Sequence, residues 1–407
     1  MANLTLKPDM ILKRAGVVFH NNAVLIRQAN RQYDDSNTLG GQKNGGAIRI
    51  RLPNKYLTQT GANLASGTAL DTTEQSITLP AGTQRHVDTN FSTSELTLDM
   101  EEFATRILEP GISTLAAMVD YTTYLNVAQQ MHNSVGTAGT TPATAAVLLD
   151  AHKTLNYFSV PQGNRYACLD PDANAALVDG LKGLFAPQTT LSDQFKSGFM
   201  GKGVLGYRDM SMSQSVYNHL CGSRSLTDTI LTNGALSTEG GTTVSMDGGT
   251  TTATVTKGDV FTMAGVFSVN SETKQSTGKL MQFVVTALNT AVTGAWTNIA
   301  FSPAIYTTTA LQNVTAFPAD NAAVVFRGVA STSYAQNIAF DSSSIVVATT
   351  DLEMPEGVHF SSRQVMDNVS MRLVRQYRIG TDDIPCRIDV LYASVLARKE
   401  GAVRIWG

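Results

Sequence analysis

Residues 110–133 constrain the fold most, because they are the longest stretch of the chain that can form one uninterrupted helix. Pro110 suits the first turn of a helix, where its missing N–H has no partner to lose. Apolar residues then recur at spacings of three and four, which places them on one helix face. The first row is Ala117, Met118, Tyr121, Tyr124, Leu125, Ala128 and Met131, and a second row is Ile112, Leu115 and Val119. At 1.5 Å per residue this helix would span about 35 Å, enough to cross a domain.

Length and composition allow two or three domains with real cores, since the chain has 407 residues, of which 43% are hydrophobic. Only 15% of the residues are charged, and the net charge of −3 is unevenly distributed. Residues 1–51 carry eight basic and three acidic side chains, and residues 363–407 carry eight basic and five acidic ones. Residues 52–362 are therefore left with a net charge of −11. The ends and the middle of different copies would therefore attract one another.

The N-terminal region predicts two short helices over residues 7–29 with a break at Asn21–Asn22, and both need a surface to dock on. Residues 47–53 then alternate between apolar and basic side chains, as a strand does. Further strand patterns cover residues 76–79, 84–88 and 94–98, around a Gly- and Thr-rich tip. We expect one long hairpin over residues 47–98 that cannot form its own core, so that an adjacent molecule must hold it.

The next part alternates between helix and strand, which is typical of an α/β unit. We expect a short helix over 99–108 capped by Asp99, a helix over 142–155, a strand over 165–169, and a helix to residue 185 capped by Asp170. Four glycines around Lys202 predict a tight turn that leads into a strand over 204–207. A phosphate-binding loop is disfavoured, because Gly203 follows Lys202 where the GxxxxGK[ST] motif needs Ser or Thr.

Residues 225–329 are rich in Thr, Gly, Val and Ala and show short alternating segments. The strands expected are 251–256, 260–263, 266–269, 280–286, 296–301 and 322–326, with a turn at 257–259. They predict a small closed or nearly closed β domain inserted into the α/β unit. Strands follow over 338–340, 345–348, 366–377 and 386–396, the last with Arg387 and Asp389 facing out, before an apolar tail that packs.

Motifs for catalysis or metal binding are missing from the sequence. The histidines stand in six separate contexts, and the acidic pair Glu101–Glu102 suits the first turn of a helix. The three cysteines, Cys168, Cys221 and Cys386, show no CxxC spacing, which favours free thiols in a reducing cytoplasm. No signal peptide and no apolar run of about 18 residues is found, so we expect no membrane association. We expect no enzyme activity, no catalytic residue, no cofactor and no metal.

Five segments, taken in order, resemble a known family. They are 48–53 (IRIRLP), 71–77 (DTTEQSI), 85–92 (RHVDTNFS), 96–98 (LTL) leading to Glu109–Pro110, and 198–207 (GFMGKGVLGY). In this order, with the helix and the β-rich block, the chain resembles the major capsid protein of tailed phages. The closest resemblance is to the short-tailed-phage coat proteins, which have a Hong Kong 97 fold and an inserted β-barrel domain. The resemblance covers essentially the whole chain.

The resemblance implies an α+β fold with six regions. They are an N-terminal arm (1–46), an extended loop (47–98), a peripheral domain (99–141) with spine helix 110–133, an axial domain (142–224), an inserted antiparallel β-barrel (225–330) and a return to the axial and peripheral domains (331–407). It further implies a late, self-assembling protein of the virion. Its pentamers and hexamers would form an icosahedral shell in the host cytoplasm, with scaffolding protein, portal protein and double-stranded DNA as partners.

Some relatives join their subunits through Lys–Asn isopeptide bonds, and Lys55 is the one lysine near the loop. No matching carboxylate or asparagine is evident, so we expect a non-covalent shell. An alternative hypothesis is a tail, appendage or other β-rich binding protein, motivated by the Thr/Gly-rich block. An enzyme is a third hypothesis, motivated by the Gly201-Lys202-Gly203 turn alone.

Overall fold

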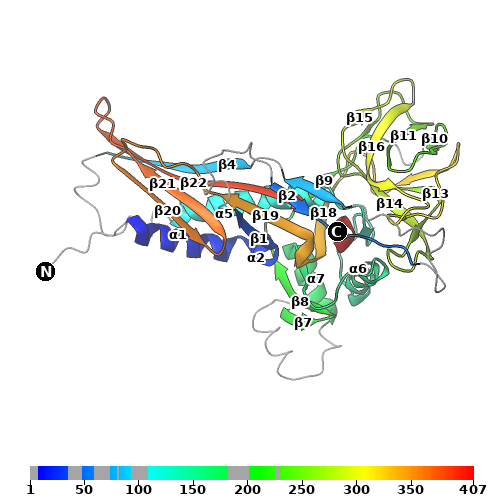
Figure 1. Ribbon diagram of the computed structural model, residues 1–407, viewed down its shortest axis with the longest axis horizontal. Helices are drawn as coiled ribbons and strands as arrows, with labels where there is room; N and C mark the ends of the chain where they lie inside the picture. The colour runs from blue at the N-terminus through cyan, green and yellow to red at the C-terminus, as the bar shows by residue number, and fades with distance from the viewer. Residues whose placement is uncertain are drawn as a thin grey trace, which may run out of the picture. The chain divides into compact units, whose positions relative to one another are not determined.

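The computed structural model describes residues 8–34, 48–58, 74–79, 82–92, 109–181, 201–224 and 229–407. They form a mixed α+β structure with two compact units (Figure 1). The first unit lies within residues 1–50, 78–124 and 345–395, and the second within 51–77, 125–344 and 396–407. Each unit is therefore assembled from three separate stretches of the chain.

The first unit is built on a six-stranded sheet. Its order is β1-β19-β22-β21-β20, and β4 also pairs with β22. The strands are β1 (Asn30–Asp34), β4 (Thr83–Ser92), β19 (Ile345–Thr350), β20 (Phe360–Met366), β21 (Val369–Arg375) and β22 (Asp383–Leu396). Because β1 pairs in parallel with β19, N-terminal and C-terminal stretches share one sheet.

Two short helices dock on this unit, which confirms the prediction for the N-terminal region. They are α1 (Pro8–Asn22), which lies against β20 and β21 (Figure 1), and α2 (Val24–Gln28). Leu12, Ala15 and Phe19 on α1 are at most 2% exposed. The break falls at Ala23 rather than at Asn21–Asn22, because the Asn pair still belongs to the last turn of α1.

The long helix is α5 (Glu109–Ala128), and it differs from the prediction in its end and in part of its buried face. It stops before residue 133 because the N–H groups of Gln130 and Met131 bond three residues back, at 3.0 and 3.3 Å, and the chain then extends. Met118 and Tyr121 are 41% and 38% exposed. The predicted second row is confirmed, since Ile112, Leu115 and Val119 are buried together with Tyr124 and Ala128 of the first row. The buried face also includes Ala116, Asp120, Thr123 and Val127, which neither predicted row contained. Polar residues within this face concealed that part of it from the hydrophobic pattern.

The expected long hairpin over 47–98 is not formed as one element. Strand β2 (Ile48–Arg51) pairs with β3 (Ser76–Leu79), whereas β4 pairs with β22 along its whole length. The ladder is supported by side chains, because Asn90 Nδ2 donates to Asp383 Oδ2 at 2.7 Å. Residues 83–92 thus bond within their own chain. The strand expected over 94–98, the helix over 99–108 and most of the hairpin tip fall outside the described residues.

The second unit contains a seven-stranded sheet of order β5-β23-β18-β6-β8-β7, with β9 also paired to β18. Its strands are β5 (Ser134–Val135), β6 (Arg165–Leu169), β7 (Gly201–Val204), β8 (Tyr207–Met212), β9 (Asn218–Leu220), β18 (Ser333–Asp341) and β23 (Ala402–Trp406). All of β23 is buried, which confirms that the apolar tail packs. The expected strand over 204–207 is instead a turn between β7 and β8, because Leu205 and Gly206 have φ of +52° and +82°.

Two helices belong to the second unit, α6 (Ala145–Tyr157) and α7 (Pro171–Leu181). The predicted cap of α7 is confirmed, since Asp170 Oδ1 accepts the N–H of Ala173 at 3.0 Å. The end predicted at residue 185 lies outside the described residues.

The β-rich block forms a six-stranded sheet of order β10-β11-β16-β14-β13-β17, beside the pair β12-β15. The strands are β10 (Leu231–Thr232), β11 (Gly241–Asp247), β12 (Thr254–Val255), β13 (Val260–Val269), β14 (Ser276–Val285), β15 (Asn289–Thr290), β16 (Trp296–Ile305) and β17 (Val324–Phe326). Its first and last strands come together at a Leu231–Ala323 bridge, so the sheet nearly closes. Phe261, Phe283 and Trp296 are fully buried inside it.

Asp389 on β22 corrects a further expectation, because it is fully buried rather than facing out. Its carboxylate accepts from Arg372 Nη2 and from Arg387 Nε, both at 2.6 Å. Two guanidinium groups outweigh the cost of burying one carboxylate, and they hold the pKa of Asp389 below its usual value although burial alone would raise it.

Candidate functional sites in the two units

The densest constellation of ionisable groups lies in the second unit around Asp259, and we call it the Asp259 centre. Its other members are His219, Arg224 and Arg404, all of them at most 1% exposed. Asp259 Oδ1 accepts from His219 Nε2 at 3.0 Å, and Oδ2 accepts from Arg224 Nη1 and the Thr256 N–H at 2.8 Å. The turn at 257–259, where Gly258 has φ of +99°, directs this carboxylate inward.

The charges of the Asp259 centre do not balance. Burial raises the pKa of Asp259, but the bonds to His219 and Arg224 outweigh it and keep the carboxylate ionised. Burial lowers the pKa of His219, which leaves the imidazole neutral with its proton on Nε2. Burial also lowers the pKa of Arg404 to about 10, and its Nη2 donates to the Gly258 carbonyl at 2.8 Å. Two guanidinium groups thus face one carboxylate.

Neither catalysis nor metal binding fits this centre. Cys221 completes a set of possible metal ligands with His219 and Asp259, all within 4.8 Å of one another. Burial raises the pKa of the Cys221 thiol to about 11, so the thiolate that a metal or an electrophile needs is disfavoured. Both oxygens of Asp259 already accept hydrogen bonds, and Arg224 repels a cation.

The Asp259 centre instead holds the two connections of the β-rich block. The chain enters the block after Cys221–Arg224 and returns at Arg327, where the Arg327 carbonyl accepts from Arg224 Nη2 at 2.8 Å. The backbone pairs again at Ser331 N to Gly222 O, 3.1 Å. The centre therefore fixes the block to the seven-stranded sheet.

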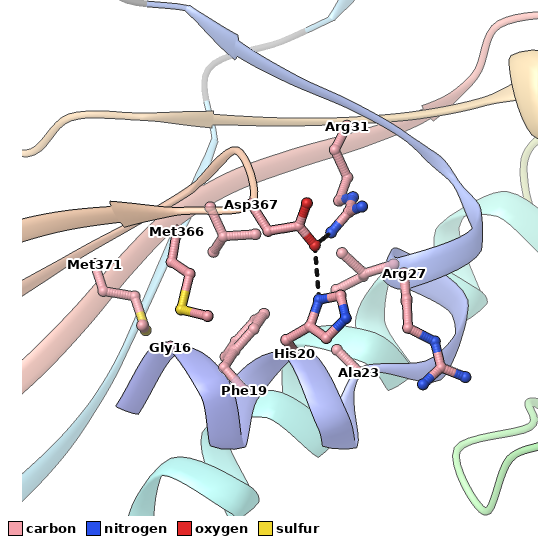
Figure 2. A pocket seen from close by; sticks show the side chains of 11 residues that line it. Gly16, Phe19, His20, Ala23, Arg27, Arg31, Met366, Asp367 and Met371 are labelled. Carbon is pink, nitrogen blue, oxygen red and sulfur yellow. Dashed lines mark hydrogen bonds and ion pairs between the residues drawn. The ribbon is translucent and has the colours of Figure 1, made fainter. Parts of the chain in front are cut away.

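In the first unit, the turn between β20 and β21 clamps the N-terminal region (Figure 2). Asp367 and Asn368 have φ of +52° and +61°, so the expected strand over 366–377 begins with a hairpin turn. The Asp367 carboxylate contacts Arg31 and lies 2.7 Å from His20 Nδ1, as Figure 2 shows. Asn368 Nδ2 donates to the Arg31 carbonyl at 3.1 Å.

A second contact holds α2 on α5. Asp120 Oδ1 accepts the N–H groups of Leu25 and Ile26 at 3.0 and 3.1 Å, which caps α2 from a residue 95 positions away. Burial raises the pKa of Asp120 to about 7, because backbone N–H groups offset desolvation only in part. The first contact holds the N-terminal helices on the hairpin of the sheet, and the second holds α2 on α5.

The residues singled out from the sequence remain apart in space or are structural. Lys202 lies on β7 in an exposed position, and Lys55 Nζ pairs with Glu400 at 2.6 Å. The three cysteines are free and buried, and Glu101–Glu102 fall outside the described residues. Sequence reasoning missed Asp259, which looked like a turn residue, and Arg404. The one available signal was an arginine inside the apolar tail.

Comparison with known proteins decides the family. The model of the family described as P22 coat protein, gene protein 5, matches residues 9–407. The chain belongs to the P22 coat protein family. It is a major capsid protein of a tailed phage, and copies of this coat protein assemble into the virion shell. The alternative of a tail or appendage protein has no support.

Solved structures similar to the coat protein include other phage capsids. "Mycobacterium phage Che8" is 12% identical, covering 94% of this chain and 90% of that chain, with a TM-score of 0.47. The mature capsid of bacteriophage PhiM1 is 11% identical, covering 93% of this chain and 85% of that chain, with a TM-score of 0.41. The CUS-3 coat protein I-domain is 26% identical, covering 25% of this chain and 96% of that chain, with a TM-score of 0.19. The family assignment depends on the sequence match alone.

No match was found among curated proteins. Among the described residues, no helix is both long enough and apolar enough to cross a membrane.

Proposed function

We propose that the coat protein has the Hong Kong 97 fold with an antiparallel β-barrel inserted at residues 225–330. The observation that carries this proposal is the near-closure of the six-stranded sheet. On either side of the Leu231–Ala323 bridge, Thr232 N donates to Ala322 O at 3.0 Å and Val324 N donates to Ile230 O at 2.9 Å. Strands that meet in this way leave no free edge between the first and last strand.

The remaining domain assignments are part of the same proposal. Residues 1–46 form the arm, 99–141 the peripheral domain with the spine helix, 142–224 the axial domain, and 331–407 the return to both. The docking of α1 and α2 on the sheet of the first unit supports the role of the arm.

The extended loop predicted over residues 47–98 reaches a neighbouring subunit through the part before β4, because β4 itself bonds within its own chain. The support is that β2 and β3 form a sheet of only two strands, which is marginally stable alone. Tyr56 and Leu57 beside it are 67% and 38% exposed. Linked contacts of this kind act at high effective concentration, so each loop strengthens the shell without a new association event.

Replacing residues 59–73 by a short Gly-Ser linker tests the extended loop. We expect a soluble chain with an unchanged melting temperature that forms no shells in electron micrographs. Normal shells from this variant would rule out the loop as an essential contact.

Scaffolding protein, portal protein and double-stranded DNA are the partners we infer. Basic residues support contact with acidic partners or DNA phosphates, since Lys13, Arg14 and Arg27 are exposed on the two N-terminal helices. Binding to DNA would be non-specific and would weaken steeply with salt. The three buried thiols outside any disulfide suit assembly in the host cytoplasm. The raised pKa of the Cys221 thiol, which disfavours a nucleophilic thiolate, suits a purely structural, non-enzymatic role.

Electron microscopy of the expressed coat protein, alone and with its scaffolding protein, tests these partners together. We expect closed particles of uniform size only with the scaffold. Identical particles from both samples would remove the scaffold from the proposal.

A further inference from the structure

A groove of about 580 Å³ lies in the second unit between α6, the segment 133–144 and strand β14. We call it the α6–β14 groove. Gln282 on β14 joins two walls of the groove, because its Oε1 accepts the Ser134 N–H at 2.5 Å and its Nε2 donates to the Ser134 carbonyl at 3.0 Å. These paired bonds fix the two walls, so the groove is preformed.

Two cations line the groove without a carboxylate partner. Arg327 Nη1 donates to the Gly136 carbonyl at 3.1 Å, and Lys279 Nζ lies 4.7 Å from the centre of the Tyr157 ring. Neither forms an ion pair with any residue that the structure describes. The third cation, Lys153, is neutralised by Asp150 on the same helix. The groove therefore carries an excess of positive charge.

Because Arg327 is partly buried, this excess of charge is costly. A guanidinium group that loses water and gains only one neutral carbonyl is poorly compensated. Burial accordingly lowers the pKa of Arg327. A carboxylate placed beside it would form a charge-assisted bond that the isolated chain lacks.

An apolar surface lies beside the cations. Leu280 lines the groove and is 39% exposed, and its register partner Phe267 on β13 is 38% exposed. Apolar side chains beside polar and basic ones are a usual composition of a protein–protein interface.

We propose that the α6–β14 groove receives a carboxylate-bearing segment from a neighbouring copy of the coat protein. Two observations favour a second copy over another protein. The shell consists of many copies of this chain, and residues 52–362 carry 25 acidic against 14 basic side chains. A groove on one face that takes an acidic segment from another face is a heterologous contact, which closes into rings.

Zero-length carbodiimide cross-linking of assembled shells tests this proposal, because it joins a lysine amine only to a carboxylate that touches it. Shells are assembled from equal amounts of ¹⁴N- and ¹⁵N-labelled coat protein, so mixed-label peptides identify links between copies. We expect Lys279 joined to Asp or Glu of another copy, and loss of this link in Lys279→Arg. Links from Lys279 only within its own chain, or only to another protein, would overturn the proposal.

The concentration needed for shell assembly gives an independent test of the groove, measured with two variants. We expect Lys279→Gln and Arg327→Gln each to raise the concentration needed for assembly about tenfold. Lys279→Arg should assemble as the wild type does. Lys257→Gln is the matched control, because Lys257 is exposed in the same block but does not line the groove. Lys279 is also exposed, so its variant folds, and unchanged assembly of Lys279→Gln would contradict the proposal.

Discussion

Two buried carboxylates of the coat protein behave in opposite ways, and their partners explain why. Asp259 has Arg224 and His219 beside it, so its pKa falls despite burial. Asp120 has mainly backbone N–H groups, with Arg27 only as a more distant charge, so burial prevails and its pKa rises to about 7. A full opposite charge in contact offsets desolvation, whereas dipoles offset it in part.

Asp259→Asn should destabilise the second unit by about 3 to 5 kcal/mol, because it leaves the Arg224 guanidinium buried without its counter-charge. Urea unfolding monitored by circular dichroism measures this change in the free energy of unfolding. Glu272→Gln, at an exposed position of the same block, should change it by less than about 0.5 kcal/mol. Equal effects of the two variants would show that the centre is not structural.

Asp120 should make the stability of the first unit depend on pH. Since its folded pKa is raised from 3.8 to about 7, the folded state holds a proton that the unfolded chain releases. The stabilisation is complete below pH 3.8 and is lost as the pH rises through 7. At 1.36 kcal/mol per pKa unit the loss is at most about 4 kcal/mol.

Asp120→Asn keeps the Oδ1 acceptor for α2 and removes the titration. We expect the wild type to lose stability between pH 4 and 7 relative to this variant, as measured by unfolding at several pH values. Parallel curves for the two proteins would contradict the assignment.

At the scale of elements, the N-terminal helices are held by the hairpin turn at Asp367–Asn368 more than by their own helical tendency. An α2 of five residues is not stable by itself in water. Gly16 allows α1 to approach the sheet closely, since a Cβ there would lie 2.5 Å from the sulfur of Met366.

Asp367→Asn should loosen α1 and α2, because it removes the charge that Arg31 and His20 contact. Hydrogen exchange in α1 and α2 should become faster while exchange in β21 and β22 is unchanged. Glu356→Gln, an exposed residue of the loop before β20, is the control. Unchanged exchange in α1 would exclude the clamp.

The cap of α7 offers a smaller test. Asp170→Ala removes the acceptor of the Ala173 N–H and should cost about 1 kcal/mol in the free energy of unfolding. Asp170→Ser should recover most of this loss, since serine is also a good cap. Failure of the serine variant to do better than alanine would argue for a different role of Asp170.

At the scale of the whole molecule, assembly should depend on ionic strength. Residues 1–51 have a balance of +5 and residues 52–362 of −11, so opposite charges on different copies attract before contact. We expect the initial rate of assembly, followed by light scattering, to fall when salt rises from 50 to 500 mM, because the Debye length shortens. If the initial rate stays constant or rises with salt, attraction between opposite charges does not drive assembly, and apolar contacts do.

The sequence predicted elements best where local signals were complete. The α7 cap, the two N-terminal helices, the β-rich block and the buried tail all carry such signals. It failed where distant residues decide the outcome. The face of α5 was predicted only in part, because Asp120 is buried only once α2 supplies its N–H groups. The pairing of β4 was wrong because its partner β22 lies about 300 residues away.

By itself the sequence determined the α+β class and, through the resemblance, the capsid function, because these depend on local periodicity and on motif order. Only the tertiary structure decided which polar side chains are buried together. The Asp259 centre, the Asp367 clamp and the α6–β14 groove each join segments that are far apart in the chain. In the Asp259 centre, opposite charges stabilise one another out of water, and no local pattern in the sequence records such a contact.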